Sequence, residues 1–237
     1  MEEQNLTYKK PKKAWKTYLY GSVFIVLCFF LILAIGFNIV YVSAPVDGES
    51  MQPTLNGTGG NNSDTVYINK FEDYNVGDII VIKKDTEDDK YIIKRVIAKE
   101  GDSVCIYYNE DTASETYGRY VLERSDAENS QSHIVEEGYI KSINDMETTY
   151  DNIYNSTTGL VSSEEWNSCF SECDGKWYFT VPTGKVFVLG DNRGNSLDSS
   201  VHGPYNVDDV VGKVDYIVKY GESKIIYFFE ALFGIEN

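Results

Sequence analysis

An uncharged apolar run from Tyr18 to Val42 dominates the hydropathy pattern. As a helix, these 25 residues would extend about 37 Å, which exceeds the roughly 30 Å hydrocarbon core of a bilayer. A cleavable signal peptide is the alternative, because Val42-Ser43-Ala44 offers the small residues of a cut site. However, the run is about twice as long as a signal-peptide core, and Pro45 would directly follow the cut. We therefore expect an uncleaved transmembrane anchor over residues 17–42.

Lysines are concentrated just before this run. Residues 1–42 contain five lysines and two glutamates, a net charge of +3. Because positive flanks stay in the cytoplasm, we expect the N-terminus inside and the rest of the chain outside the membrane. The whole chain has a formal net charge of −16, so that remainder carries −19. Such acidity argues against a nucleic-acid partner, which would need a basic face.

Beyond the anchor, short apolar stretches alternate with turns, a pattern typical of antiparallel β structure. Gly77-Asp78 and Gly101-Asp102 interrupt the first group of stretches. The sequence shows no repeat and no long amphipathic helix before its C-terminal end. We therefore expect a mainly β fold behind the N-terminal transmembrane helix, with strands over 65–69, 78–82, 91–98, 103–108, 177–181, 185–190 and 210–220.

Residues 109–175 are polar, acidic and weakly periodic, which indicates a subdomain inserted into the β core. The apolar stretch 224–234 has only eleven residues, too few to span a bilayer, so it forms either a packed terminal helix or an interfacial one. The expected organisation is a basic N-terminus (1–16), the anchor (17–42), a β core in two parts (43–108 and 176–223), the insert (109–175) and a C-terminal segment (224–237).

Lys94 is unusual because it lies in an apolar stretch, Y-I-I-K-R-V-I-A at 91–98. Strand alternation would place it among Ile and Val side chains, with Arg95 on the opposite face. The lysine would then snorkel, form an ion pair, or be neutral, since burial disfavours the ammonium form and lowers its pKa. A pKa decrease from about 10.4 to about 7.5 requires roughly 4 kcal/mol. A neutral Lys94 would be a candidate general base.

Two other segments contain possible partners for such a base. G-E-S-M-Q-P-T-L at 48–55 consists of common loop residues and is either a juxtamembrane linker or the carrier of a nucleophile. Its Ser50 would need an adjacent base to become nucleophilic. The stretch 186–204 is either a long turn that caps its own backbone or a loop whose hydroxyls and carboxylates position the base. Because sequence spacing does not show contact, the pairing of Ser50 with Lys94 is a hypothesis.

Three motifs follow the anchor in a fixed order: S-M-x-P-T-L, then K-R-V leading to G-D, then G-D-N-R-x-N-S-x-D-S. In this arrangement the chain resembles bacterial type I signal peptidases of the serine/lysine kind. The segments that carry the likeness, 48–55, 64–70, 91–102 and 186–214, form roughly a quarter of the chain. The resemblance implies an antiparallel β catalytic core with an inserted β-rich subdomain.

The resemblance also implies the activity, a membrane-anchored serine endopeptidase that cleaves signal peptides from exported preproteins after small residues (Ala-x-Ala-like). Its partners would be those signal peptides and plasma-membrane lipid, with no nucleic acid, and it would need no metal or organic cofactor. The catalytic domain would lie on the extracytoplasmic side of the plasma membrane. Lys94 in place of a histidine separates the chain from the similar endoplasmic-reticulum enzymes and points to a bacterial membrane.

The resemblance assigns roles to individual residues. Ser50 matches the nucleophile, and Lys94 matches the general base that later protonates the leaving amine. Ser196 matches the hydroxyl that orients the lysine amine, and the Ser50 backbone N–H would meet the oxyanion. Supporting positions in the strand, the turn and the loop are matched by Arg95, Met51, Pro53, Gly190, Asp191 and Asp198.

Three positions depart from the family pattern. Gly48 stands where some relatives have a serine that contributes to the oxyanion site, so a second donor would have to be backbone or water. Ser200 stands where an arginine is usual, which removes an ion pair with Asp198. Gly194 replaces a commoner aspartate. These changes affect support rather than chemistry, so we expect activity to survive them.

Two alternative functions remain open from the sequence. One is a Ser/His/Asp hydrolase built from Ser50, His202 and either Asp191 or Asp198. The other is a non-catalytic surface protein whose insert binds a partner. A zinc site is disfavoured, because the chain has two histidines and no C-x-x-C. Cys169 and Cys173 could pair in an oxidising exterior.

Overall fold

The computed structural model describes residues 15–58, 62–84, 90–127 and 132–222. The expected C-terminal segment, and most of the basic N-terminus, lie outside this range. The chain divides into two compact units, with the boundary after Val40. The first unit contains helix α1 (Trp15–Val40), which is long and apolar enough to cross a membrane. The helix ends two residues before the end of the apolar run, because Tyr41 already begins a strand.

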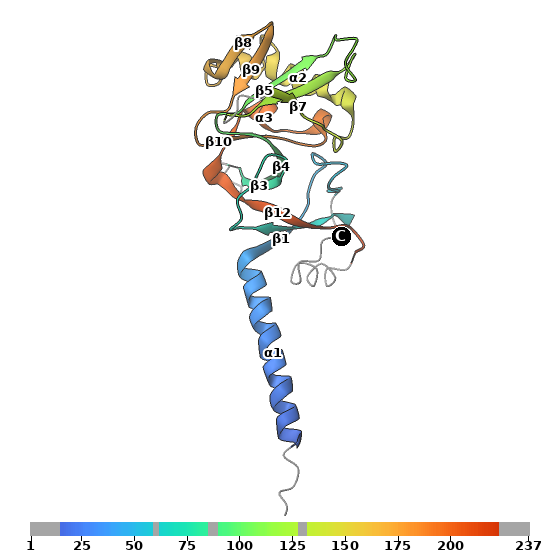
Figure 1. Ribbon diagram of the computed structural model, residues 1–237, viewed down its shortest axis with the longest axis vertical. Helices are drawn as coiled ribbons and strands as arrows, with labels where there is room; N and C mark the ends of the chain where they lie inside the picture. The colour runs from blue at the N-terminus through green and yellow to red at the C-terminus, as the bar shows by residue number, and fades with distance from the viewer. Residues whose placement is uncertain (1–14, 59–61, 85–89, 128–131, 223–237) are drawn as a thin grey trace, which may run out of the picture. The chain divides into compact units, whose positions relative to one another are not determined.

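The second unit contains a seven-stranded sheet in which every pair is antiparallel (Figure 1). Its strands, in spatial order, are β1 (Tyr41–Pro45), β2 (Thr65–Asn69), β12 (Val210–Val218), β3 (Ile79–Lys83), β4 (Tyr91–Lys99), β10 (Lys185–Leu189) and β11 (Tyr205–Asn206). The sheet thus brings together chain segments from both sides of the expected insert.

A second antiparallel sheet of five strands has the order β7-β6-β5-β9-β8. These strands are β7 (Ser132–Ile134), β6 (Tyr120–Ser125), β5 (Ser103–Tyr108), β9 (Lys176–Thr180) and β8 (Phe170–Cys173). The sheet therefore starts before residue 109 and ends after residue 175. Helix α2 (Met146–Tyr154) follows β7 in the chain, and the four-residue helix α3 (Ser199–His202) follows β10.

All seven strands expected from the sequence are present, which confirms the mainly antiparallel β fold. β2 and β5 have the expected bounds, and β12 ends at Val218, two residues early. The additional strands β1, β6, β7, β8 and β11 are short or only partly apolar. Their sequences therefore give a weak alternation signal.

Packing joins the two sheets to the loops that follow them. One buried cluster combines strand residues such as Phe179 and Phe187 with Met146 and Ile153 of α2. A second cluster lies under the turn between β1 and β2 and includes Met51. Because the turn at 48–55 is anchored by buried apolar side chains, it is part of the folded core rather than a linker.

Candidate active site

Ser50 lies in the turn between β1 and β2, and buried apolar neighbours hold this turn against the sheet. Met51 and Leu55 are almost fully buried and pack with Val66 and Ile68 of β2. The backbone N–H of Leu55 donates to the carbonyl of Met51 at 2.9 Å. Met51, expected to shape this turn, has a buried side chain that anchors it.

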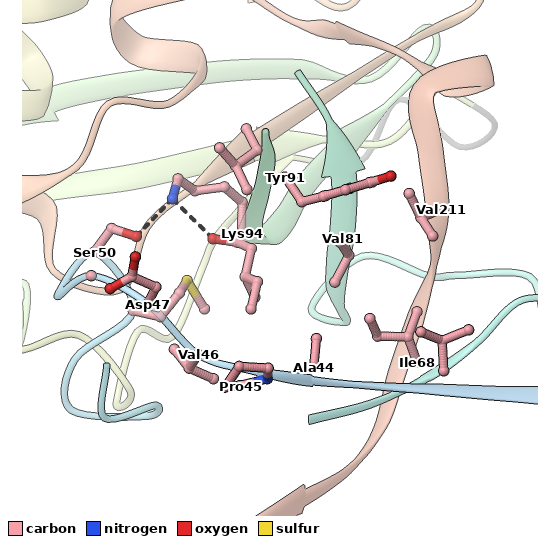
Figure 2. A pocket seen from close by; sticks show the side chains of 15 residues that line it. Ala44, Pro45, Val46, Asp47, Ser50, Ile68, Val81, Tyr91, Lys94 and Val211 are labelled. Atoms are coloured by element: carbon pink, nitrogen blue, oxygen red, sulfur yellow. Dashed lines mark hydrogen bonds between the residues drawn. The ribbon is translucent and has the colours of Figure 1, made fainter. Parts of the chain in front are cut away.

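Lys94 reaches this turn from strand β4. Its Nζ lies 2.7 Å from Ser50 Oγ and donates to the Ile93 carbonyl at 2.9 Å (Figure 2). The lysine is only 3% exposed, and this burial lowers its pKa from 10.5 to about 8, against the opposing effect of Asp198 and Asp191. A substantial fraction of Lys94 is therefore neutral near pH 8, and its amine is within reach of the serine proton.

The loop after β10 contacts the backbone of the turn that carries Ser50. The Asn192 N–H donates to the Ser50 carbonyl at 3.0 Å, and Asn192 Nδ2 donates to the Glu49 carbonyl at 3.0 Å. At Gly190, an added Cβ would lie 2.5 Å from the Ser50 carbonyl oxygen and 2.3 Å from Ser196 Oγ. Sequence reasoning missed Asn192 as a contact, although it lies inside the quoted G-D-N-R motif.

Asp191 connects this loop to both the turn and strand β4. Its carboxylate accepts from Arg95 Nε at 2.9 Å, from Arg95 Nη2 at 2.6 Å and from Thr54 Oγ1 at 2.5 Å. Asp191 is completely buried, so its charge depends on this bidentate partner. Arg95 also donates to the Gly77 carbonyl at 2.7 Å. Thr54 was not assigned a role from the sequence, although it belongs to the S-M-x-P-T-L motif.

Asp198 stabilises the start of the same loop through hydrogen bonds. Its Oδ2 accepts the Gly190 N–H at 2.8 Å, while Oδ1 accepts both the N–H and the hydroxyl of Ser200, at 3.0 and 2.9 Å. Asp198 is thus the N-cap of α3. Ser200, which stands where the family pattern has an arginine, satisfies one oxygen of this carboxylate with its hydroxyl.

Two other expected participants do not bond to the pair. Ser196 Oγ is buried and has no hydrogen-bond partner among the described residues, and no bond joins it to Lys94. His202 is an exposed residue of α3, and the partial desolvation of its ring lowers its pKa. The described contacts show no bond from it to Ser50. Cys169 and Cys173 are both free thiols in this structure.

A cavity of about 460 Å³ opens beside the pair. Ser50 and Lys94 lie at one end, while β1, β3 and the first residues of β4 form apolar walls (Figure 2). The lining residues are Val42, Ala44, Pro45, Val46, Asp47, Gly48, Ser50, Met51, Ile68, Val81, Tyr91, Ile92, Ile93, Lys94 and Val211. The space is suited to an apolar chain that passes the serine.

Comparison with known proteins places this chain in a family. The family model for signal peptidases, peptidase S26, matches residues 17–219. The chain belongs to this family. It is 27% identical over 220 residues to "Signal peptidase I U" of Bacillus subtilis (strain 168), covering 90% of this chain and 91% of that relative. It is 26% identical over 190 residues to "Signal peptidase I" of Streptococcus pneumoniae serotype 4, covering 78% and 85%.

Within this S26 peptidase, Gly48 is constrained by its backbone. Its φ is +88°, a backbone conformation that residues with a side chain rarely adopt. Its N–H donates to the Gly57 carbonyl at 2.9 Å. An added Cβ would meet open space, so conformation rather than contact favours glycine here. Because its N–H is already used, Gly48 does not offer a second backbone donor to an oxyanion in this arrangement.

Proposed function

We propose that the protein is a membrane-anchored serine endopeptidase that removes signal peptides from exported preproteins, with Ser50 as nucleophile and neutral Lys94 as general base. The proposal rests chiefly on one observation: the 2.7 Å approach of Lys94 Nζ to Ser50 Oγ at a site where Lys94 is buried. Membership of the signal peptidase family supports the substrate class.

In the proposed first step, Ser50 Oγ attacks the scissile carbonyl carbon while Lys94 Nζ takes the hydroxyl proton. The resulting ammonium then gives this proton to the leaving amine, which breaks the peptide bond and leaves an acyl-enzyme. A water molecule, deprotonated by the same amine, releases the signal peptide and regenerates Ser50. The backbone N–H of Ser50 would stabilise the oxyanion, in the manner of donors worth a few kcal/mol.

Ser196 is the proposed orienting hydroxyl for Lys94. Its Oγ is buried beside Gly190 and has no partner among the described residues. Such a group retains its capacity to donate and accept, and a buried hydroxyl without a bond is costly. Rotation of Ser196 toward the ammonium formed during the reaction would satisfy both groups.

An extended substrate fits the edge of strand β4. β10 pairs with β4 only from Arg95 onward, so among the described strands none pairs with the second edge of Tyr91–Lys94. A peptide can add to such an edge as a further strand and place alternate side chains in the adjacent cavity. The apolar walls, which include Ala44 and Ile92, support a preference for small, uncharged residues before the cut.

The proposed location is the plasma membrane, with the N-terminus in the cytoplasm and the catalytic domain outside. Helix α1 has the length and composition of a membrane span, and five lysines precede most of it. The lipid of that membrane would be the second partner, beside the signal peptides themselves.

A preprotein cleavage assay with single variants tests this function. We expect Ser50→Ala and Lys94→Ala to lose cleavage by at least about 1,000-fold, because each removes a member of the reacting pair. His202→Ala is the matched control and should retain full activity. Active Lys94→Ala would overturn the mechanism, and loss of activity in His202→Ala alone would favour the Ser/His/Asp alternative.

Complementation in cells separates the enzyme from a non-catalytic surface protein. With Ser50→Ala as the only copy, precursors of exported proteins should accumulate, as seen by the larger size of the uncut forms. Normal precursor processing in those cells would count against the proposed function and would favour a binding role for the insert.

A further inference from the structure

A short segment between β7 and α2 brings the insert against the loop after β10 and against strand β4. Three of its residues contact three supports of the Ser50–Lys94 pair. Glu137 pairs with Arg193, Tyr139 lies against Arg95, and Lys141 bonds to Asp191. We call Glu137, Tyr139 and Lys141 the insert latch.

Tyr139 covers the guanidinium group that holds Asp191. The Arg95 Cζ atom lies 4.0 Å from the centroid of the Tyr139 ring, a cation–π geometry. The edge of the same guanidinium makes the two hydrogen bonds to Asp191. Burial raises the pKa of Tyr139 to about 12, so its ring stays a neutral phenol at working pH. Arg95 is thus clamped between an aromatic face and a carboxylate.

Glu137 holds the second arginine of the site. The side chains of Arg193 and Glu137 are 0% and 6% exposed and form an ion pair. Arg193 Nε also donates to the Gly190 carbonyl at 2.9 Å, and its Nη1 contacts Met146 Sδ of α2 at 3.1 Å. A buried guanidinium needs a buried counter-charge, and here the insert provides it.

Lys141 adds a third contact to the same loop. Its backbone N–H donates to the Asp191 carbonyl at 3.0 Å. Its Nζ donates to Gln52 Oε1, two residues beyond the nucleophile, at 3.3 Å. The latch therefore reaches strand β4, the loop after β10 and the nucleophile turn.

We propose that the insert latch is a positioning element for catalysis, in which Tyr139 clamps Arg95 against Asp191 and Glu137 holds Arg193 against Gly190. This inference rests on the proposed function. Asp191 in turn accepts from Thr54 of the nucleophile turn, and Gly190 lies directly against the Ser50 carbonyl. A small displacement of either support moves Ser50 relative to Lys94, and misplacement by about 1 Å costs on the order of 100-fold in rate.

Tyr139→Leu tests the clamp, because leucine keeps apolar volume but lacks the π face. We expect kcat on a preprotein to fall about tenfold or more with KM changed less than about twofold, since no latch residue lines the cavity beside Ser50. Without the ring, water would reach Arg95 and weaken its ion pair with Asp191. The less compensated Asp191 carboxylate would then raise the pKa of Lys94. The acidic midpoint of kcat/KM should therefore move to higher pH.

Two variants make this test specific. Tyr139→Phe keeps the aromatic ring and should therefore retain most of the wild-type kcat and the wild-type pH midpoint. Tyr74→Leu is the matched control, because the Tyr74 ring lies 5.2 Å from Lys99 Nζ in a similar contact away from the site. Tyr74→Leu should leave kcat and the midpoint unchanged. Wild-type kcat and midpoint in Tyr139→Leu would overturn the proposal.

Glu137→Gln tests the second arm of the latch against Glu123→Gln. Glu123 forms an ion pair with Lys176 inside the five-stranded sheet and is also poorly exposed. After correction for folded protein, we expect Glu137→Gln to lower kcat and Glu123→Gln to leave it unchanged. Equal kcat in the two variants would show a merely structural role and refute the inference. If wild type itself fails to cleave, the proposed function fails instead.

Discussion

At the scale of single residues, the central feature is a lysine kept where its charge is disfavoured. Lys94 is 3% exposed, and desolvation is the largest cause of its lowered pKa. Asp198 and Asp191 oppose this shift, but each carboxylate is itself bonded to Ser200 or Arg95. Two carboxylates thus lie near Lys94, each held by its own hydrogen-bond donors, and burial outweighs their effect on the Lys94 pKa.

The pH dependence of the reaction follows from this lysine. Because the base must be neutral and its pKa is about 8, kcat/KM should rise tenfold per pH unit below pH 8 and level off above it. Lys84→Gln should move the midpoint to higher pH, because the Lys84 ammonium lowers the Lys94 pKa. Both profiles are measured with a peptide substrate between pH 6 and 10. A midpoint near 10.5, or a flat profile, would contradict a buried general base.

The sequence predicted Ser50 and Lys94 as a pair, and the structure brings their side chains together, but several contacts around them could not be predicted. Ser50 and Lys94 stand in short motifs with a recognisable order, and the apolar neighbours of Lys94 indicated its burial. The Arg95–Tyr139 contact joins residues 44 positions apart, one in strand β4 and the other in a turn after β7. No local periodicity reports such a contact, because it depends on how the insert packs.

At the scale of elements, the residues that follow strand β10 fix the position of the turn that carries Ser50. Leu189 is the last residue of the strand, and Gly190 then approaches both the Ser50 carbonyl and Ser196. Asp198 fixes the N–H of Gly190, and Arg193 fixes its carbonyl. The loop is therefore held on both sides of the peptide unit that lies next to the Ser50 carbonyl.

Replacement of Gly190 by alanine should damage this contact. The new Cβ would lie 2.5 Å from a backbone oxygen of Ser50, which has little freedom to move. We expect kcat to drop about 100-fold through displacement of Ser50, and stability to fall by about 1–3 kcal/mol through overpacking. Thermal melting checks that the variant is folded during the assay. Wild-type kcat in a folded Gly190→Ala protein would show that the close approach is not required.

Elements differ in how well the sequence predicted them. Five strands of the seven-stranded sheet contain several Val or Ile residues, and their periodicity located them: β2, β3, β4, β10 and β12. Helix α2 was missed inside a polar region, yet it buries Met146, Thr149 and Ile153 at helical spacing. That spacing was a usable signal. Strand β1 was hidden, because its first two residues continue the apolar run of α1.

At the scale of the whole molecule, the chain consists of an apolar helix and a β unit that is compact by itself. Helix α1 has no buried residue, while the second unit contains all three buried apolar clusters. Ser50 lies ten residues beyond Val40, so extended chain at about 3.5 Å per residue keeps it within roughly 35 Å of the helix end. The proposed membrane anchor would therefore keep the site close to the bilayer.

Removal of residues 1–38 should separate chemistry from membrane placement. The shortened protein keeps β1 and every contact of the site, so it should fold and cleave a soluble peptide with kcat/KM within about threefold of the full chain. Cleavage of a preprotein in vesicles should fall at least about tenfold, because the tether no longer raises the local concentration of enzyme at the bilayer. Cooperative thermal unfolding establishes that the β unit is intact. Equal loss on both substrates would mean that the helix supports the site itself, whereas equal retention would mean that anchoring contributes nothing to the rate.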